Sequence, residues 1–249
     1  MTIGSESITL NLGCLTDVGK VRDINQDCFS TNLEFGLFMV ADGMGGHLAG
    51  EKAAQSAVEV VTAMVCEEAA QNGDAVGLIR RAIQEANRQI VQASLQDASM
   101  RGMGTTATVA IAQGDTLYFG HVGDSRAYLI KQGKEIEQVT EDHSVVAQLL
   151  KAGAITPQEA AHHPYRNVIT RCLGMQMDVE ADTLEATWQP GDSLLLCTDG
   201  LSGLVSDEEM LAMATQDEDP QDACQKMLDL AMARGGYDNI TVVLIRYEK

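Results

Sequence analysis

The chain has 249 residues, of which 45% are hydrophobic, enough for a sizeable core within one domain. Its net charge of −19 argues against binding to nucleic acid, which requires a basic face. An acidic membrane surface would also repel the chain. The N-terminal residues lack the pattern of a signal peptide, and no segment reaches the roughly 18 apolar residues of a membrane helix. With six widely spaced cysteines and no C-x-x-C pair, we expect a single cytoplasmic domain spanning 1–249.

The first half of the chain is predicted to contain two helices followed by three strands. Apolar residues recur at helical spacing from Ala53 to Met64 and again from Ile79 to Ile90. The period then changes to that of strands, which are separated by turns containing Gly and Asp. The three predicted strands are 104–113, 116–122 and 126–131.

The second half carries capping and stop signals of four helices. They are Val145–Gly153, a capping box at Thr156, a second at Ser206, and Asp219-Pro220 through Gly235-Gly236. Strands are predicted at 192–200 and 239–248, and the segment from about Thr140 to Gly174 on the surface. Because strands come in adjacent runs and helices in pairs, the pattern favours an α+β fold with helices outside stacked antiparallel sheets.

Carboxylates border four apolar strands: Asp42, Asp124, Asp199 and Asp238. One Asp-Gly after a strand is most often a simple turn, but here the pattern recurs, three times beside a glycine. Acids gathered at sheet ends raise one another's pKa unless a cation neutralises them. An all-oxygen ligand set suits Mg²⁺ or Mn²⁺ rather than Zn²⁺. Ca²⁺ is disfavoured because the sequence has no D-x-D-x-D-G loop.

Arg22 lies in a short polar cluster near the N-terminus and has two interpretations. It can pair locally with Asp23 or Asp27 and do nothing more. Its guanidinium fork also suits two oxygens of a phosphate, and a phosphate clamp beside a carboxylate metal site is chemically coherent.

Eight short motifs then appear in order along almost the whole chain. They are R-x-x-N-Q-D (22–27), V-A-D-G-M-G-G-H (40–47), G-T-T-A (104–107), V-G-D-S-R-A-Y (122–128), T-E-D-H (140–143), N-V-I-T-R-C-L-G (167–174), C-T-D-G-L (197–201) and D-N-I-T (238–241). The ordered set resembles the metal-dependent protein phosphatases of the 2C type, in their compact bacterial form. The resemblance implies a four-layer α-β-β-α sandwich, in which two antiparallel sheets are flanked by helices. It also implies hydrolysis of phosphoserine and phosphothreonine esters by direct attack of a metal-bridging hydroxide.

The resemblance further implies a set of metal ligands. Carried over by position, Asp42 would bridge two core Mn²⁺ or Mg²⁺ ions, and the carbonyl of Gly43 would bind one of them. Asp199 and Asp238 would complete the ligands of the other ion. Asp124, together with Asp199, corresponds to the site of a third, weaker ion used by bacterial members.

Two further residues and one segment receive roles from the same resemblance. Arg22 would hold the phosphate, and Asp27 would orient metal-bound water without binding the metal itself. The segment at about 140–175 falls where the family carries a mobile flap beside the site.

The chain departs from the animal members of the family at two positions. Those members have His directly after the Asp-Gly as a proposed general acid, whereas this chain has Met44. His47 stands three residues further on without an assigned role, and metal-bound water is the alternative proton source. Animal members also have Glu where this chain has Gln26, which is expected to change one water contact.

Other function classes fit less well. A dinucleotide-binding module would need G-x-G-x-x-G, but after Asp42 the last position of this motif is Leu48. A P-loop kinase or ATPase is disfavoured because the sequence has no G-x-x-x-x-G-K-[ST]. No cysteine begins the C-x₅-R signature of the cysteine-dependent tyrosine phosphatases. The remaining alternative is a catalytically silent phosphoprotein-binding regulator on the same fold, although all four strand-end carboxylates are present. We expect a monomeric enzyme that acts on phosphorylated proteins, in particular the substrates of a cognate Ser/Thr kinase.

Overall fold

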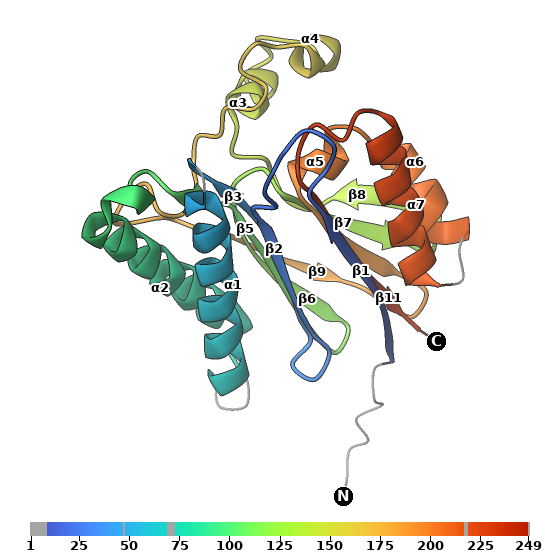
Figure 1. Ribbon diagram of the computed structural model, residues 1–249. Helices are drawn as coiled ribbons and strands as arrows, with labels where there is room; N and C mark the ends of the chain where they lie inside the picture. The colour runs from blue at the N-terminus through green and yellow to red at the C-terminus, as the bar shows by residue number, and fades with distance from the viewer. Residues whose placement is uncertain (1–8, 47, 69–72, 217–218, 249) are drawn as a thin grey trace, which may run out of the picture.

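The computed structural model describes residues 9–46, 48–68, 73–216 and 219–248. Two antiparallel sheets lie face to face with helices on both outer faces (Figure 1). The five-stranded sheet has the order β1 (Leu10–Asp17), β11 (Ile240–Tyr247), β10 (Ser193–Cys197), β7 (Arg126–Lys131), β8 (Glu135–Gln138). The six-stranded sheet has the order β2 (Asp27–Asn32), β3 (Leu37–Met44), β5 (Ala107–Gln113), β6 (Thr116–Val122), β9 (Asp182–Thr187), with β4 (Gly104–Thr105) beside β3.

Helices form the two outer layers. The six-stranded sheet is covered by α1 (Ala49–Glu68) and α2 (Ala75–Gln96), which is followed by the 3₁₀ helix η1 (Ala98–Met100). The five-stranded sheet is covered by α5 (Asp199–Ser202), α6 (Asp207–Gln216) and α7 (Pro220–Ala233). The predicted four-layer sandwich is therefore confirmed. Among the described helices, none combines the length and apolarity needed to cross a membrane.

Side-chain alternation along the strands separates three apolar layers. In β3, Leu37 and Met39 pack against α1 and α2, whereas Phe38 and Val40 point into the space between the sheets. Trp188 lies in that middle layer as well. Since successive side chains of a strand point to opposite faces, a strand buried on both faces is apolar throughout, which is the pattern that makes β3 conspicuous in the sequence.

The structure differs from the sequence prediction at two strand ends near the acids. The predicted strand 104–113 is interrupted at Thr106, whose N–H donates to the Asp42 carbonyl at 2.9 Å. The predicted strand 192–200 ends at Cys197, because Thr198 begins helix α5 as its N-cap residue. Both changes redirect the chain where the acidic residues gather.

The segment that contains α3 (Val145–Lys151) and α4 (Pro157–Ala161) projects from the layered body beyond the sheet ends (Figure 1). The predicted capping box at Thr156 is confirmed, since Thr156 N–H donates to the Glu159 carboxylate at 2.8 Å and the Thr156 hydroxyl accepts from Glu159 N–H. The capping box at Ser206 is also present. The two helices fall within the segment predicted to be a flap.

Candidate active site

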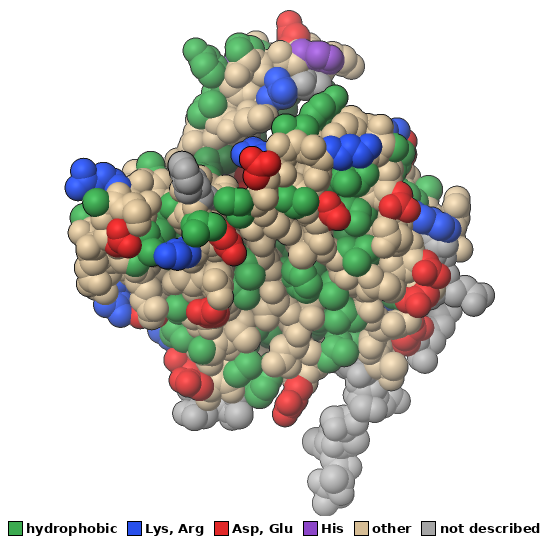
Figure 2. All heavy atoms as spheres, viewed as in Figure 1, with side chains coloured by type: hydrophobic (Ala, Val, Ile, Leu, Met, Phe, Trp, Pro, Cys, Tyr) green, Lys and Arg blue, Asp and Glu red, His purple; other side chains and the backbone are tan. Residues whose placement is uncertain are grey.

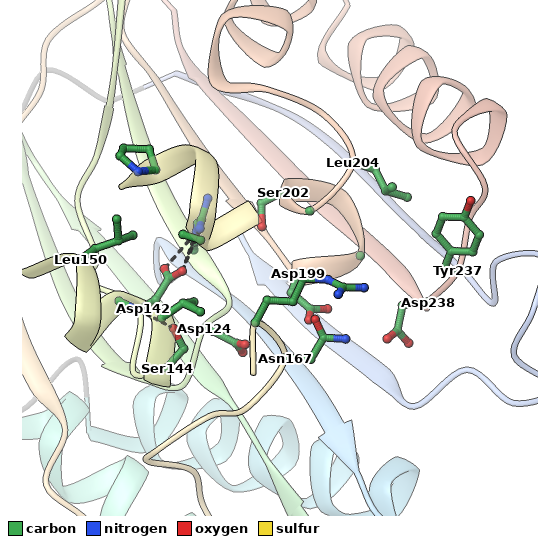
Figure 3. A pocket seen from close by; sticks show the side chains of 18 residues that line it. Asp124, Asp142, Ser144, Leu150, Asn167, Asp199, Ser202, Leu204, Tyr237 and Asp238 are labelled. Carbon is green, nitrogen blue, oxygen red and sulfur yellow. Dashed lines mark hydrogen bonds and ion pairs between the residues drawn. The ribbon is translucent and has the colours of Figure 1, made fainter. Parts of the chain in front are cut away.

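The topology brings the predicted acids from both sheets to one end of the sandwich. Asp42 lies in β3 opposite Asp27 of β2. Asp124 follows β6, Asp199 begins α5 and Asp238 precedes β11. Figure 3 shows Asp124, Asp199 and Asp238 lining one cavity.

These carboxyl groups are closely surrounded by protein while each keeps a partly accessible surface, as at the floor of a depression. Burial raises the pKa of Asp42 well above its ordinary value, and repulsion from Asp27, Asp199, Asp124 and Asp238 raises it further. Burial, followed by repulsion from Asp199, raises the pKa of Asp124 to about 7. The pKa of Asp199 is also raised, by burial and then by repulsion from Asp238. Crowding of this kind is unfavourable unless positive charge enters the centre.

Asp27 is held by two threonines from the opposite sheet. Its Oδ2 accepts hydrogen bonds from the hydroxyls of Thr198 at 2.8 Å and Thr241 at 2.7 Å. Burial raises the pKa of Asp27 to about 7, although both hydroxyls oppose the shift. Neither threonine was assigned a role from the sequence, and only their position beside Asp199 and Asp238 in two of the motifs could have pointed to them.

Two buried carboxylate oxygens lack a hydrogen-bond partner within the described part of the chain: Oδ1 of Asp27 and Oδ1 of Asp199. Buried polar atoms are nearly always satisfied, so two orphans in one acidic cluster indicate that the site is built for a ligand that donates or coordinates. All the donors gathered here are oxygens, which suits Mg²⁺ or Mn²⁺. No group of three His, Cys, Asp or Glu side chains in the described ranges is already arranged to hold an ion, so the carboxylates would have to draw inward around one.

Arg22 lies at the rim of this cluster. Its Nη2 donates to Oδ2 of Asp238 at 2.7 Å, so it pairs with neither Asp23 nor Asp27, the local partners considered from the sequence. The adjacent Asn239 anchors the Arg22 loop, because its Nδ2 donates to the carbonyls of Val18 and Ile24. Asn239 therefore fixes both ends of the loop beside the Asp238 strand, a role that the sequence did not reveal.

The turn that carries Asp124 is clamped on both sides by the T-E-D-H segment. The Gly123 N–H donates to Nδ1 of His143 at 3.0 Å, and the His143 N–H donates to the Gly123 carbonyl at 2.7 Å. On the other side, Arg126 donates from Nε and Nη2 to the Asp142 carboxylate, at 2.8 Å for Nη2 to Oδ2. The base of the projecting helices is thus tied to the Asp124 turn.

Gly43 occupies a position where a side chain does not fit. A Cβ on this residue would collide with the backbone carbonyls of Gly50 and Gln26. Met44 is half-buried at the end of β3, and Gln26 donates from Nε2 to the Gly45 carbonyl at 3.4 Å. His47 lies outside the described residues.

A family model for protein phosphatase 2C matches residues 20–233. The chain belongs to the protein phosphatase 2C family. It is similar to the serine/threonine phosphatase stp of Listeria welshimeri, with 37% identity over 240 residues that cover 92% of this chain and 93% of that protein.

Solved structures of the protein phosphatase 2C fold match the chain along its length. The serine/threonine phosphatase PstP/Ppp of Mycobacterium tuberculosis aligns with a TM-score of 0.90 at 36% identity, covering 98% of this chain and 100% of that one. The catalytic domain of PstP in complex with two manganese ions aligns with a TM-score of 0.89 at 34% identity and the same coverage. The predicted family and sandwich fold are confirmed.

Proposed function

We propose that this chain is a metal-dependent protein serine/threonine phosphatase that hydrolyses phosphoserine and phosphothreonine esters. The observation that carries the proposal is the convergence of five carboxylates, with orphaned oxygens on Asp27 and Asp199, beside Arg22. Membership of the protein phosphatase 2C family supports it, as does the manganese complex of a structural neighbour. The cofactor is Mn²⁺ or Mg²⁺.

The residues present fit a binuclear centre. Asp42, the carbonyl of Gly43, Asp199 and Asp238 would hold two core ions, and Asp124 with Asp199 would hold a third, weaker one. When bound, such ions activate water as a nucleophile and neutralise charge on the phosphate. Burial, followed by repulsion from the neighbouring carboxylates, raises the pKa of Asp42, and bound cations would relieve both effects, which supports this assignment.

Arg22 is proposed to hold the phosphate. Its Nη2 donates to Asp238, and within the described part of the chain no side chain or carbonyl accepts from its Nε or Nη1. The pair with Asp238 orients the guanidinium plane, and the remaining N–H groups are available for two phosphate oxygens. In that position Arg22 would also take up charge that develops on the phosphate during hydrolysis.

Asp27 is proposed to orient the attacking water. With Oδ2 fixed by two threonine hydroxyls, the carboxylate cannot rotate freely, and Oδ1 remains as the acceptor. A water that donates to this oxygen is held in one orientation, which lowers the entropic part of the barrier.

The wider context is proposed from the same features. We infer one catalytic domain over 1–249, since the middle apolar layer joins both sheets, with a flap at about 140–175 formed around the projecting helices. Substrates would be phosphoproteins of a cognate Ser/Thr kinase in bacterial signalling. The net charge of −19 favours a monomeric protein without nucleic-acid or membrane partners. The six widely spaced cysteines, with no C-x-x-C pair, favour the reducing cytoplasm.

Hydrolysis of p-nitrophenyl phosphate and of a phosphothreonine peptide, with Mn²⁺, Mg²⁺ or chelator, tests this function. We expect activity that requires metal and that falls by about two orders of magnitude or more in Asp42→Asn and in Asp199→Asn, with folding checked by circular dichroism. Equal activity after exhaustive chelation would refute the mechanism. Binding of the phosphopeptide without turnover at any metal concentration would instead support a silent regulator on this fold.

A further inference from the structure

A cavity of about 550 Å³ begins at the acidic centre and continues between the projecting helices and the body (Figure 3). Asp124, Asp199 and Asp238 line its inner end. Phosphate binding and hydrolysis, as proposed above, use only this end. The remainder of the cavity has a different lining and needs a different occupant.

Apolar side chains form the outer walls. They come from α3, from α4, from the segment after α5 and from the turn before β11: Val146, Leu150, Pro157, Ala160, Leu204 and Tyr237. Leu150 is 37% exposed and Tyr237 is 64% exposed, so both side chains keep apolar surface that the core does not bury. Figure 2 shows hydrophobic side chains both on the projecting segment and on the body below it.

The charged groups in this part of the cavity are largely compensated. Arg126 and Asp142 neutralise each other through the bidentate pair at the flap base. Arg166 supplies one positive charge to the lining, against the three carboxylates of the inner end. An acidic neighbour of the phosphorylated residue would lose its hydration against these apolar walls, in a chain of net charge −19, whereas an apolar neighbour would meet walls of its own kind.

We propose that this cavity receives an apolar side chain adjacent to the phosphorylated residue of a protein substrate, and so selects phosphosites with a Leu-like neighbour. The inference rests on the proposed phosphatase activity, because the inner end must hold the phosphate while the outer end holds the neighbour. Continuity of the two ends within one cavity supplies the geometric link. A partly buried Leu-sized side chain accounts for a preference of about tenfold.

Matched phosphothreonine peptides test the inference. In one series the residue before phosphothreonine is Leu, Gly or Asp, and in the other series the residue after phosphothreonine is varied in the same way. The measured quantity is the ratio of kcat/KM for the Leu peptide to that for the Gly peptide, taken within each protein preparation so that differences in active fraction cancel. Fluorescence anisotropy of the same peptides on Asp199→Asn gives binding without turnover.

The variants are Leu150→Asp in the wall and Leu95→Asp as a matched control on α2, where Leu95 is 78% exposed. In at least one series, we expect a ratio of about ten in the unmodified protein and in Leu95→Asp, and a ratio near one in Leu150→Asp. The Asp peptide is expected to be the poorest substrate of the three. Binding to Asp199→Asn should follow the same order.

A ratio near one in the unmodified protein, or a preference that survives Leu150→Asp, would overturn the inference. So would a change in oligomeric state with Leu150→Asp at an unchanged ratio, which would assign the apolar walls to contact between copies. These failures are distinct from failure of the phosphatase proposal, in which neither the peptides nor p-nitrophenyl phosphate would be hydrolysed.

Discussion

Asp27 and Asp42 are register partners in the antiparallel pair of β2 and β3, so two carboxylates face each other across adjacent strands. Like charges at directly opposed positions destabilise a sheet, and here burial and three further acids strengthen the effect. The end of the sandwich that is proposed to act on phosphate is therefore expected to be the least stable part of the metal-free protein.

Asp42→Asn should stabilise the metal-free protein while abolishing activity. Folding raises the pKa of Asp42, so the folded protein loses stability as pH rises and this carboxyl group is forced to ionise. Asn cannot ionise, so the stability that the variant gains over the parent should increase towards pH ~8 and reach about 1–3 kcal/mol. Urea unfolding in chelator, at several pH values, measures it. Asp178→Asn, an exposed matched control, should change little. A loss of stability in Asp42→Asn at every pH would contradict the crowding.

Thr241→Val should weaken the support of Asp27. The substitution keeps the shape of the side chain but removes the hydroxyl that donates to Oδ2 at 2.7 Å. We expect a destabilisation of about 1–2 kcal/mol and a further rise in the pKa of Asp27, because that hydrogen bond lowers it. Carboxyl NMR titration of Asp27 and urea unfolding are the measurements. Thr187→Val, at an exposed position of β9, should have neither effect.

Gly123→Ala should be costlier than Gly102→Ala, although both glycines have positive φ. At Gly123 φ is +118° and an added Cβ would lie 2.5 Å from Cγ2 of Thr106, whereas at Gly102 φ is +77° and nothing lies within 4 Å. Backbone strain alone costs about 1 kcal/mol, and overpacking adds about 1–3 kcal/mol. Thermal unfolding of the two variants measures the difference. Equal losses of stability would mean that an added Cβ at Gly123 does not collide with Thr106.

His121 should make the protein sensitive to acid. Burial, followed by repulsion from His143, lowers its pKa from 6.5 to about 4. Below pH ~6.5 the unfolded chain binds a proton at this histidine, whereas the folded chain does not until pH ~4. The free energy of unfolding should therefore fall by about 3 kcal/mol as pH drops from ~6.5 to ~4. His121→Gln should flatten the dependence of unfolding free energy on pH in this window. His162→Gln, on an exposed histidine, should leave the slope unchanged.

Arg22→Lys and Arg22→Ala should separate charge from geometry. Lys keeps the charge but loses the fork, so kcat/KM for p-nitrophenyl phosphate should fall about tenfold, and about 10²-fold or more for Ala. The side chain of Arg22 is 51% exposed, so its pair with Asp238 contributes little to stability and both variants should unfold like the parent. Arg80→Lys, on α2, is the matched control. Equal activity of the Arg22 variants and the parent would remove Arg22 from the phosphate site.

The central strands were recognisable from the sequence, and the edge strands were not. Strands buried on both faces, such as β3 and β11, are continuous apolar runs, and their signal is local. The four unpredicted strands, β1, β2, β8 and β9, are the outer strands of the two sheets, with few fully buried positions. Because an edge strand is defined by its neighbour rather than by its own periodicity, tertiary pairing had to reveal it.

The sequence by itself determined the residue types of the candidate site, the helix caps, the α+β class and, through its ordered motifs, the family. Only the tertiary structure decided which groups meet: Arg22 with Asp238 rather than with Asp23 or Asp27, Asp27 with Thr198 and Thr241. The reason is physical. Periodicity and capping are encoded within a few residues, whereas convergence of side chains more than a hundred residues apart depends on strand order and register, which burial of the whole core selects.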